Sequence, residues 1–266
     1  MARAFGSELL KFRRWSVLAS AGVMMAASAF IAYLTFHQIA SGATGPEMTD
    51  LIRSFRTTQG LVAIIGQARS LIIAIALIIV SANIAAEWSQ GTLRNLLVRE
   101  PGRLRLLAGK MLALLLFVAV SLALTLLISA TFVIAVAQSQ GISTAAWTSP
   151  EGIRIFLSFF GNEALCLAGI SFLGLLIAVL ARSTGAAVGI ALAYVLVPEG
   201  LIAVVWPEGS EWLPVRVFNY VVGATVPSIG PTPPQGYPAA LGVSLLWMAG
   251  FVAVSAVVFR RQDVKA

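Results

Sequence analysis

The chain has 266 residues, of which 59% are hydrophobic and only 11% are charged, and its mean hydropathy is +0.91. Soluble domains carry about 25% charged residues, so this composition excludes a water-soluble globular protein and predicts an all-α polytopic membrane protein. The net charge of +7 does not indicate nucleic-acid binding, because the cations lie in short segments between apolar runs, where they set membrane orientation.

Six apolar segments are predicted to be transmembrane helices, since a helix needs roughly 20 residues to cross the hydrocarbon core. They cover residues 16–36, 70–86, 111–136, 156–181, 185–206 and 239–259 of a single transmembrane domain, 1–266. Six spans place both termini on one side of the membrane. If that side is the cytoplasm, 13 of the 18 basic residues lie in the inner segments. The positive-inside rule therefore predicts an N-in, C-in protein of the cytoplasmic membrane, bacterial or archaeal.

The residues before the first span predict an interfacial helix. Its apolar positions recur at helical spacing, and its cations lie on other faces. These residues are Phe5, Leu9 and Phe12, with Lys11, Arg13 and Arg14. Such a helix can lie on the inner membrane surface with its cations toward anionic headgroups. The alternative is a solvated basic flank that only fixes the topology.

Two longer outer loops are predicted, at residues 37–69 and 207–238. The first is expected to be partly helical from Glu47, and its residues from Leu61 on form an apolar lead-in to the second span. Arg69 comes at the start of the second span, where we expect its side chain to snorkel to the outer interface. The second loop ends in the stretch PSIGPTPPQGYP, which has too many prolines for a regular helix.

The longest inner loop, residues 87–110, reads EWSQGTLRNLLVREPGRLRLLAGK. Leu93, Leu96 and Leu97 share one face of a short helix. Ser89 can cap the start of that helix, and a proline–glycine pair ends it. Glu87, at the junction of span and loop, can pair with Arg94 or with a cation of the N-terminal helix. The pattern fits a helix that docks on a cytoplasmic partner and equally an interfacial helix that lies on lipid.

Three features within the spans are candidates for special roles. Asn162 and Glu163 form a possible intramembrane polar site. Placing a carboxylate at the bilayer centre costs on the order of 3 kcal/mol, so such a residue usually has a role. Contact with substrate or gating is one reading, and packing or placement near the outer headgroups is the other. Gly185 and Gly189 permit close approach of another helix, which is expected to belong to the same chain and not to a second subunit. Pro198 is expected to start short re-entrant helices or to end the fifth span early.

The chemistry of an enzyme is missing from the sequence. The only Gly-Lys pair precedes Met111, so there is no P-loop. Two aspartates, Asp50 and Asp263, one histidine and one cysteine do not suit a magnesium or zinc site. Cys166 in an apolar helix is expected to be an inert hydrophobe. We therefore expect no catalysis, cofactor or metal on this chain.

The inner loop resembles the signature of ABC-2-type transporter permeases, in which a glutamate precedes Gly-Thr-Leu-Arg, a leucine pair, Pro-x-Arg and a Gly-Lys that opens the next span. The matching positions are Glu87, Gly91, Thr92, Leu93, Arg94, Leu96, Leu97, Pro101, Arg103 and Lys110. The closing stretch FRRQDV is similar to the end of such permeases, although Gln262 separates the arginine pair from the aspartate.

The resemblance implies a complex of two permease subunits, identical or homologous, with two copies of an ATPase subunit that holds ATP and Mg²⁺. The loop would carry the coupling helix that docks in a groove of the ATPase, and the interfacial helix would brace this joint. The implied function is export of an amphiphilic substrate such as a drug, an antibiotic or a lipid-like compound. One alternative is a permease-like subunit of a mechanical or maturation complex. Another is a secondary transporter, although no internal repeat is visible.

Overall fold

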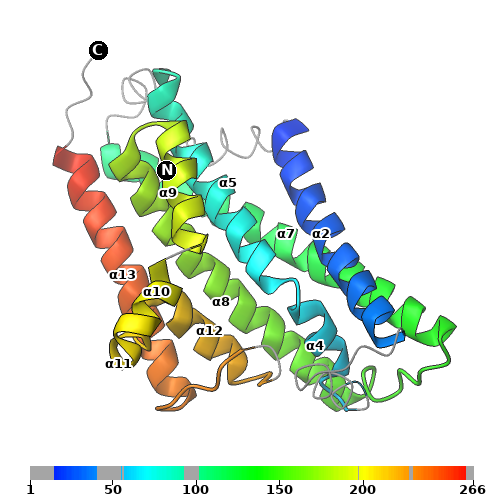
Figure 1. Ribbon diagram of the computed structural model, residues 1–266. Coiled ribbons are helices and arrows are strands. Elements are labelled where there is room, and N and C mark those ends of the chain that lie inside the picture. The colour runs from blue at the N-terminus through cyan, green and yellow to red at the C-terminus, as the bar shows by residue number, and fades with distance from the viewer. Residues whose placement is uncertain are drawn as a thin grey trace.

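Figure 1 shows a computed structural model of the chain, which describes residues 15–40, 55, 57–92, 102–196, 198–227 and 230–261. Every regular element within these residues is an α-helix, and none is a strand. The all-α prediction is therefore confirmed for the described part of the chain.

Four of the described helices are long and apolar enough to cross a membrane. They are α5 (Arg69–Ser89), α7 (Arg103–Ser139), α8 (Pro150–Ala181) and α13 (Tyr237–Arg261). Each contains one of the predicted spans. The first predicted span lies in α2 (Trp15–Ala40), whose 26 residues reach about 39 Å at ~1.5 Å per residue. The chain is a multi-pass membrane protein, and the count of six spans stays a prediction.

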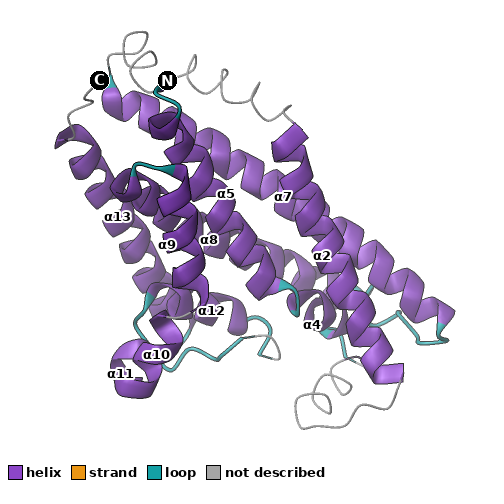
Figure 2. Cartoon of the chain, turned by 45° about the horizontal axis from the view of Figure 1, so that its top comes forward, coloured by secondary structure: helices purple, strands orange, loops and turns teal. Residues whose placement is uncertain are grey.

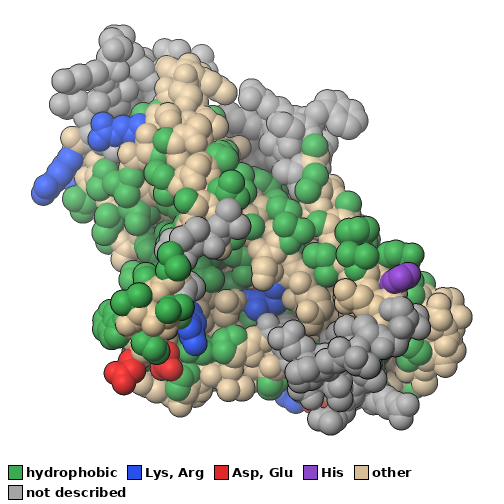
Figure 3. Space-filling view, viewed as in Figure 1, with side chains coloured by type: hydrophobic (Ala, Val, Ile, Leu, Met, Phe, Trp, Pro, Cys, Tyr) green, Lys and Arg blue, Asp and Glu red, His purple; other side chains and the backbone are tan. Residues whose placement is uncertain are grey.

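The helices run side by side between two ends of the molecule (Figures 1 and 2). We call the end where α5 and α13 finish and α7 begins the loop end, and the opposite one the far end. Arg260 and Arg261 lie in the last turn of α13 at the loop end, and Glu208 lies in a short helix at the far end. In Figure 3 the visible acidic side chains lie at the far end, whereas cationic side chains lie at both ends.

Helix α8 is the centre of the bundle and packs against α5, α7 and α13. Two of its glycines allow close approach. Gly174 lies under Val80 of α5, and Gly169 lies under the ring of Phe218. A Cβ atom at Gly169 would overlap that ring, so the position requires glycine. At the edge of the bundle, α2 is joined to α7 by a buried hydrogen bond of 2.8 Å between the Ser28 and Ser129 hydroxyls.

The predicted fifth span, residues 185–206, is not one helix. The structure has α9 (Thr184–Leu196) followed by α10 (Pro198–Val205). Proline has no N–H to donate and its ring clashes with the preceding turn, so a new helix begins at Pro198. The expected break at Pro198 is confirmed, and one helix through residue 206 is wrong. A re-entrant course of the short helices stays a prediction.

The outer loop predicted at residues 207–238 contains two helices, α11 (Pro207–Ser210) and α12 (Pro214–Gly223). The prediction of a loop is wrong for α12, whose Phe218 and Val221 are fully buried. Proline is tolerated in the first turn of a helix because the N–H it lacks has no partner there. Pro214 therefore starts this helix instead of preventing it.

The outer loop predicted at residues 37–69 also contains buried structure. Helix α2 runs into it, and all seven residues of α4 (Gly60–Gly66) are buried. Gly60 has no side chain, and this lets the indole of Trp147 and the backbone of Phe55 approach α4 closely. The Trp147 indole N–H donates to the Phe55 carbonyl at 3.0 Å. This contact encloses the helix. The expected helical structure in this stretch is therefore present at residues 60–66.

The glycine pair of α9 does not pack as predicted. No described atom lies within 4 Å of a Cβ placed on Gly185 or on Gly189, and both residues are exposed. Helix α9 instead packs on α5, and its buried residues are Ala187 and Ala191. The expected contact of the glycine pair within the chain is wrong, because these alanines, one turn apart, form the buried face.

Candidate functional site

The inner loop of the sequence begins and ends at a buried ion pair. Glu87 lies in the last turn of α5, Lys110 lies in the first turns of α7, and their side chains pair. The side chains are only 8% and 4% exposed. Leaving one charge of such a pair without the other is strongly destabilising. The pair therefore fixes the two helix ends from which the loop departs. The sequence singled out both residues as motif positions but paired Glu87 with Arg94 or a cation of the N-terminal helix, which lie outside the described residues.

The next residue of α5 contacts a different helix. The indole of Trp88 meets the ring of Phe259 of α13 edge to face, with ring centroids 5.7 Å apart. Aromatic pairs in this geometry add about 0.5–1.5 kcal/mol to the burial of their surface. The end of α5 is therefore held to the end of α13.

Ser89, the last residue of α5, contacts a third helix. Its hydroxyl oxygen accepts a hydrogen bond of 2.8 Å from the backbone N–H of Thr184, and the Thr184 hydroxyl donates to it at 3.0 Å. Thr184 is the first residue of α9, where backbone N–H groups lack partners within the helix. The prediction that Ser89 caps a helix of the loop is wrong, because its hydroxyl caps α9.

Three consecutive residues thus connect the end of α5 to three other helices: Glu87 to α7, Trp88 to α13 and Ser89 to α9. Successive helical residues point about 100° apart, so one turn can contact neighbours in three directions. We call Glu87, Trp88, Ser89 and their three partners the loop base.

The other predicted motif residues fall into two groups. Within the described chain, Gly91 has φ +63°, which glycine adopts without strain, and the Thr92 hydroxyl donates to the Glu87 carbonyl at 3.5 Å. Arg103 is the first residue of α7. The remaining positions lie outside the described residues: Leu93, Arg94, Leu96, Leu97 and Pro101, with Phe5, Leu9, Lys11, Phe12, Arg13 and Arg14 of the interfacial helix.

A second buried ion pair lies deeper in the bundle. The Nε of Arg69 is 2.6 Å from Oε2 of Glu163, and these side chains are 6% and 1% exposed. The guanidinium also donates to Oδ1 of Asn219 on α12 at 3.0 Å and approaches the Cys166 sulfur at 3.8 Å. The prediction that Arg69 snorkels to the interface is wrong, because Glu163 offers a charged partner inside the bundle. Oε1 of Glu163 has no hydrogen-bond partner among the described residues.

The neighbouring Asn162 uses both ends of its amide. Its Nδ2 donates to the Val221 carbonyl at 3.0 Å and to the Thr225 hydroxyl, and its Oδ1 accepts from the Tyr237 hydroxyl at 2.9 Å. Asn162 thereby joins α8 to α12 and α13. The two polar residues predicted as one site therefore make separate contacts within the chain.

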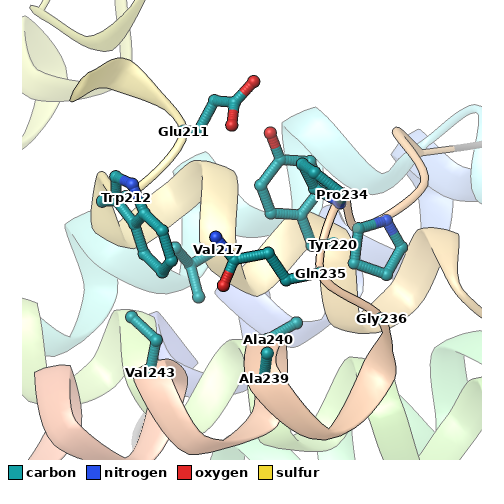
Figure 4. A pocket seen from close by; sticks show the side chains of 11 residues that line it. Glu211, Trp212, Val217, Tyr220, Pro234, Gln235, Gly236, Ala239, Ala240 and Val243 are labelled. Atoms are coloured by element: carbon teal, nitrogen blue, oxygen red, sulfur yellow. The ribbon is translucent and has the colours of Figure 1, made fainter. Parts of the chain in front are cut away.

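The far end has a small cleft between α12, α13 and the segment 233–236, shown in Figure 4. Trp212 and Tyr220 stand on its two sides, and Gln235 lies between them. Its cavity volume of about 20 Å³ has room for about one water molecule. In this conformation the cleft is too small for an amphiphilic substrate.

The fold and the loop base agree with the comparison with known families. A family model described as "ABC-2 family transporter protein" matches residues 4–198. Comparison with curated proteins gives no match. The matched segment includes α2 to α9 and the whole inner loop, and membership of this family implies an ABC transporter with an ATPase partner. The chain belongs to the ABC-2 family of transporter proteins, as a multi-pass membrane permease.

Proposed function

We propose that this chain is the permease subunit of an ATP-driven exporter that moves an amphiphilic substrate across the cytoplasmic membrane. A separate ATPase subunit drives it by docking on the loop between Glu87 and Lys110. The observation that carries the proposal is the loop base, in which the last turn of α5 contacts α7, α13 and α9 through three consecutive residues.

The loop base would pass a movement of the loop to several helices at once. An ATPase that binds ATP and Mg²⁺ changes conformation, and the docked loop moves with it. Because α5, α7, α9 and α13 are joined there, they would shift together as rigid elements. The coupling requires that the ATPase contacts differ between two states of the permease.

The proposed complex contains two permease subunits and two ATPase subunits, with the substrate path between the permeases. The outward-facing glycines of α9, Gly185 and Gly189, support this arrangement, because small residues let helices of two subunits approach closely. At the far end, Glu199 connects α10 to α12, which supports a rigid outer cover for the path. Its carboxylate accepts from the Val215 and Arg216 backbone N–H groups, each at 2.9 Å.

The test is purification of the tagged chain from its native membrane, followed by identification of the copurifying proteins by mass spectrometry. A P-loop ATPase in stoichiometric amount is the expected result. Leu97→Glu should release this ATPase, because burying a carboxylate against apolar surface costs several kcal/mol. Gln90→Glu is the control: it adds the same charge to the same loop but away from the leucines, and this variant should retain the ATPase. Retention of the ATPase by Leu97→Glu would contradict docking through the leucine face.

A permease-like subunit of a mechanical or maturation complex remains the alternative. Reconstituted complexes distinguish the two, because an exporter should hydrolyse ATP faster when its amphiphilic substrate is present in the liposome. A secondary transporter would copurify with no ATPase and would instead respond to an ion gradient.

A further inference from the structure

An apolar groove opens on the side of the bundle near the loop end, between α7, α8 and α13. Its cavity volume is about 420 Å³, which lies at the lower end of the range for small-molecule sites, about 300–1,000 Å³. The walls are entirely hydrophobic. They include Leu107, Leu112, Phe172, Leu175 and Ala256.

Cationic side chains continue two walls of the groove toward the loop end. Arg105 precedes Ala108 and Leu112 by three and seven residues, so it lies on the face of α7 that lines the groove. Arg260 follows Ala256 by four residues and lies on the same face of α13. Both arginines are exposed.

The direction of the Arg105 side chain fits this placement. Its Cδ, Cγ and Cβ atoms lie 3.2–3.4 Å from a Cβ position built on Gly102. The side chain therefore leans back over the beginning of α7, toward the loop end. A long cationic side chain near a helix end adopts this direction in a membrane.

We propose that the groove binds one anionic phospholipid, with an acyl chain between α7, α8 and α13 and the phosphate at Arg105 and Arg260. Hydrocarbon fits the apolar walls, and the two cations select a negative headgroup. Under the orientation predicted from the basic residues, the loop end faces the cytoplasmic leaflet, whose anionic lipids attract such cations. The proposal does not depend on the substrate or on the docking of an ATPase.

The test uses native mass spectrometry of the full-length chain, delipidated in detergent and then mixed with dioleoyl phosphatidylglycerol or dioleoyl phosphatidylcholine. Phosphatidylglycerol should remain bound under conditions that remove phosphatidylcholine. Arg105→Gln and Arg260→Gln should each weaken phosphatidylglycerol binding about fivefold, which corresponds to about 1 kcal/mol per cation. Arg154→Gln removes an exposed cation at the far end and should change nothing.

A second pair of variants tests the groove itself. Ala256→Phe fills the groove and should abolish retention of the lipid, whereas Val254→Phe, on another face of α13, should leave it intact. Both variants must first match the wild type in helix content and in thermal unfolding without lipid. Thermal unfolding gives a measurement that needs no groove variant. Added phosphatidylglycerol should raise the unfolding temperature of the wild type more than that of Arg105→Gln.

Three results would overturn the proposal. Equal retention of the two lipids would mean that any hydrocarbon fills the groove. Normal retention by a folded Ala256→Phe chain would place the lipid elsewhere. Loss of a dimer instead of a lipid in Ala256→Phe, visible in the same spectra, would mean that a second copy of the chain covers this face.

Discussion

Arg69 and Glu163, separated by 94 residues in sequence, form an ion pair of 2.6 Å between the first turn of α5 and the middle of α8. Burying a charged group in an apolar bundle costs free energy. In this pair, the attraction of the opposite charge offsets that cost for each residue. The amide oxygen of Asn219 adds α12 to the same cluster. The cluster thereby joins α5, whose other end belongs to the loop base, to the central helix α8 and to α12.

Glu163→Ala should destabilise the chain by about 3–5 kcal/mol, because it leaves the buried Arg69 charge without its partner. Thermal unfolding in detergent measures the effect. Arg69→Met combined with Glu163→Leu replaces both charges by hydrophobic groups and should recover most of the stability. Arg154→Gln, which breaks the exposed pair with Glu151, is the control and should unfold like the wild type. A Glu163→Ala chain as stable as the wild type would contradict a structural role for the pair.

Two glycines of α8 should respond differently to alanine. Gly169→Ala places a methyl group into the ring of Phe218 and should cost about 1–3 kcal/mol, as overpacking does. Gly161→Ala meets no described atom within 4 Å and should be neutral or stabilising by up to about 1 kcal/mol. The difference in unfolding temperature between the two variants is the measurement. Equal effects would mean that α8 and α12 are not as close as the structure places them.

Glu199→Ala should loosen the beginning of α12. The carboxylate accepts from two backbone N–H groups of the first turn and from the Tyr194 hydroxyl, and removal of a helix cap costs about 0.5–2 kcal/mol. Hydrogen–deuterium exchange should become faster at the amides of Val215 and Arg216. Glu208→Ala, at an exposed acidic residue of α11, should leave those amides unchanged. Unchanged exchange in Glu199→Ala would exclude the capping role.

Cysteine labelling should place the two ends of the molecule on opposite sides of the membrane. In a Cys166→Ala background, Gln90→Cys reports on the loop end and Thr232→Cys on the far end, since both positions are exposed. The asymmetry of basic residues predicts that only Thr232→Cys reacts with an impermeant maleimide added to intact cells. Reaction of both cysteines from outside would contradict the N-in, C-in orientation.

The sequence predicted the long helices well because lipid exposure makes nearly every residue of such a helix apolar. It missed α12, since the prolines around residues 214–238 resemble those of a loop. In sequence, a proline at the first position of a helix cannot be told from a proline that prevents a helix. The sequence indicated the apolar residues of α4 but missed the contact that encloses them, which depends on Trp147 from a distant segment.

The site was predicted only as far as individual residues. The motif pointed to Glu87 and Lys110, and the apolar context pointed to Glu163. The partners could not be read from a single sequence, because each ion pair joins residues on different helices whose packing sets the distance. The same reason explains Ser89, whose partner on α9 is 95 residues away.

In the proposed mechanism the loop base transmits the action of an ATPase to the membrane helices, and variants of the Glu87–Lys110 pair test this coupling. Spin labels at Gln140→Cys and Thr232→Cys, in a Cys166→Ala background, report distances across the far end by double electron–electron resonance. In the assembled complex, trapping the ATPase with vanadate should shift this distance distribution.

Glu87→Lys should abolish the shift while ATP hydrolysis continues, because two buried cations cannot hold the ends of α5 and α7 together. Glu87→Lys combined with Lys110→Glu restores opposite charges and should restore the shift. A full vanadate-dependent shift in the folded Glu87→Lys complex would contradict the claim that the loop base carries the coupling.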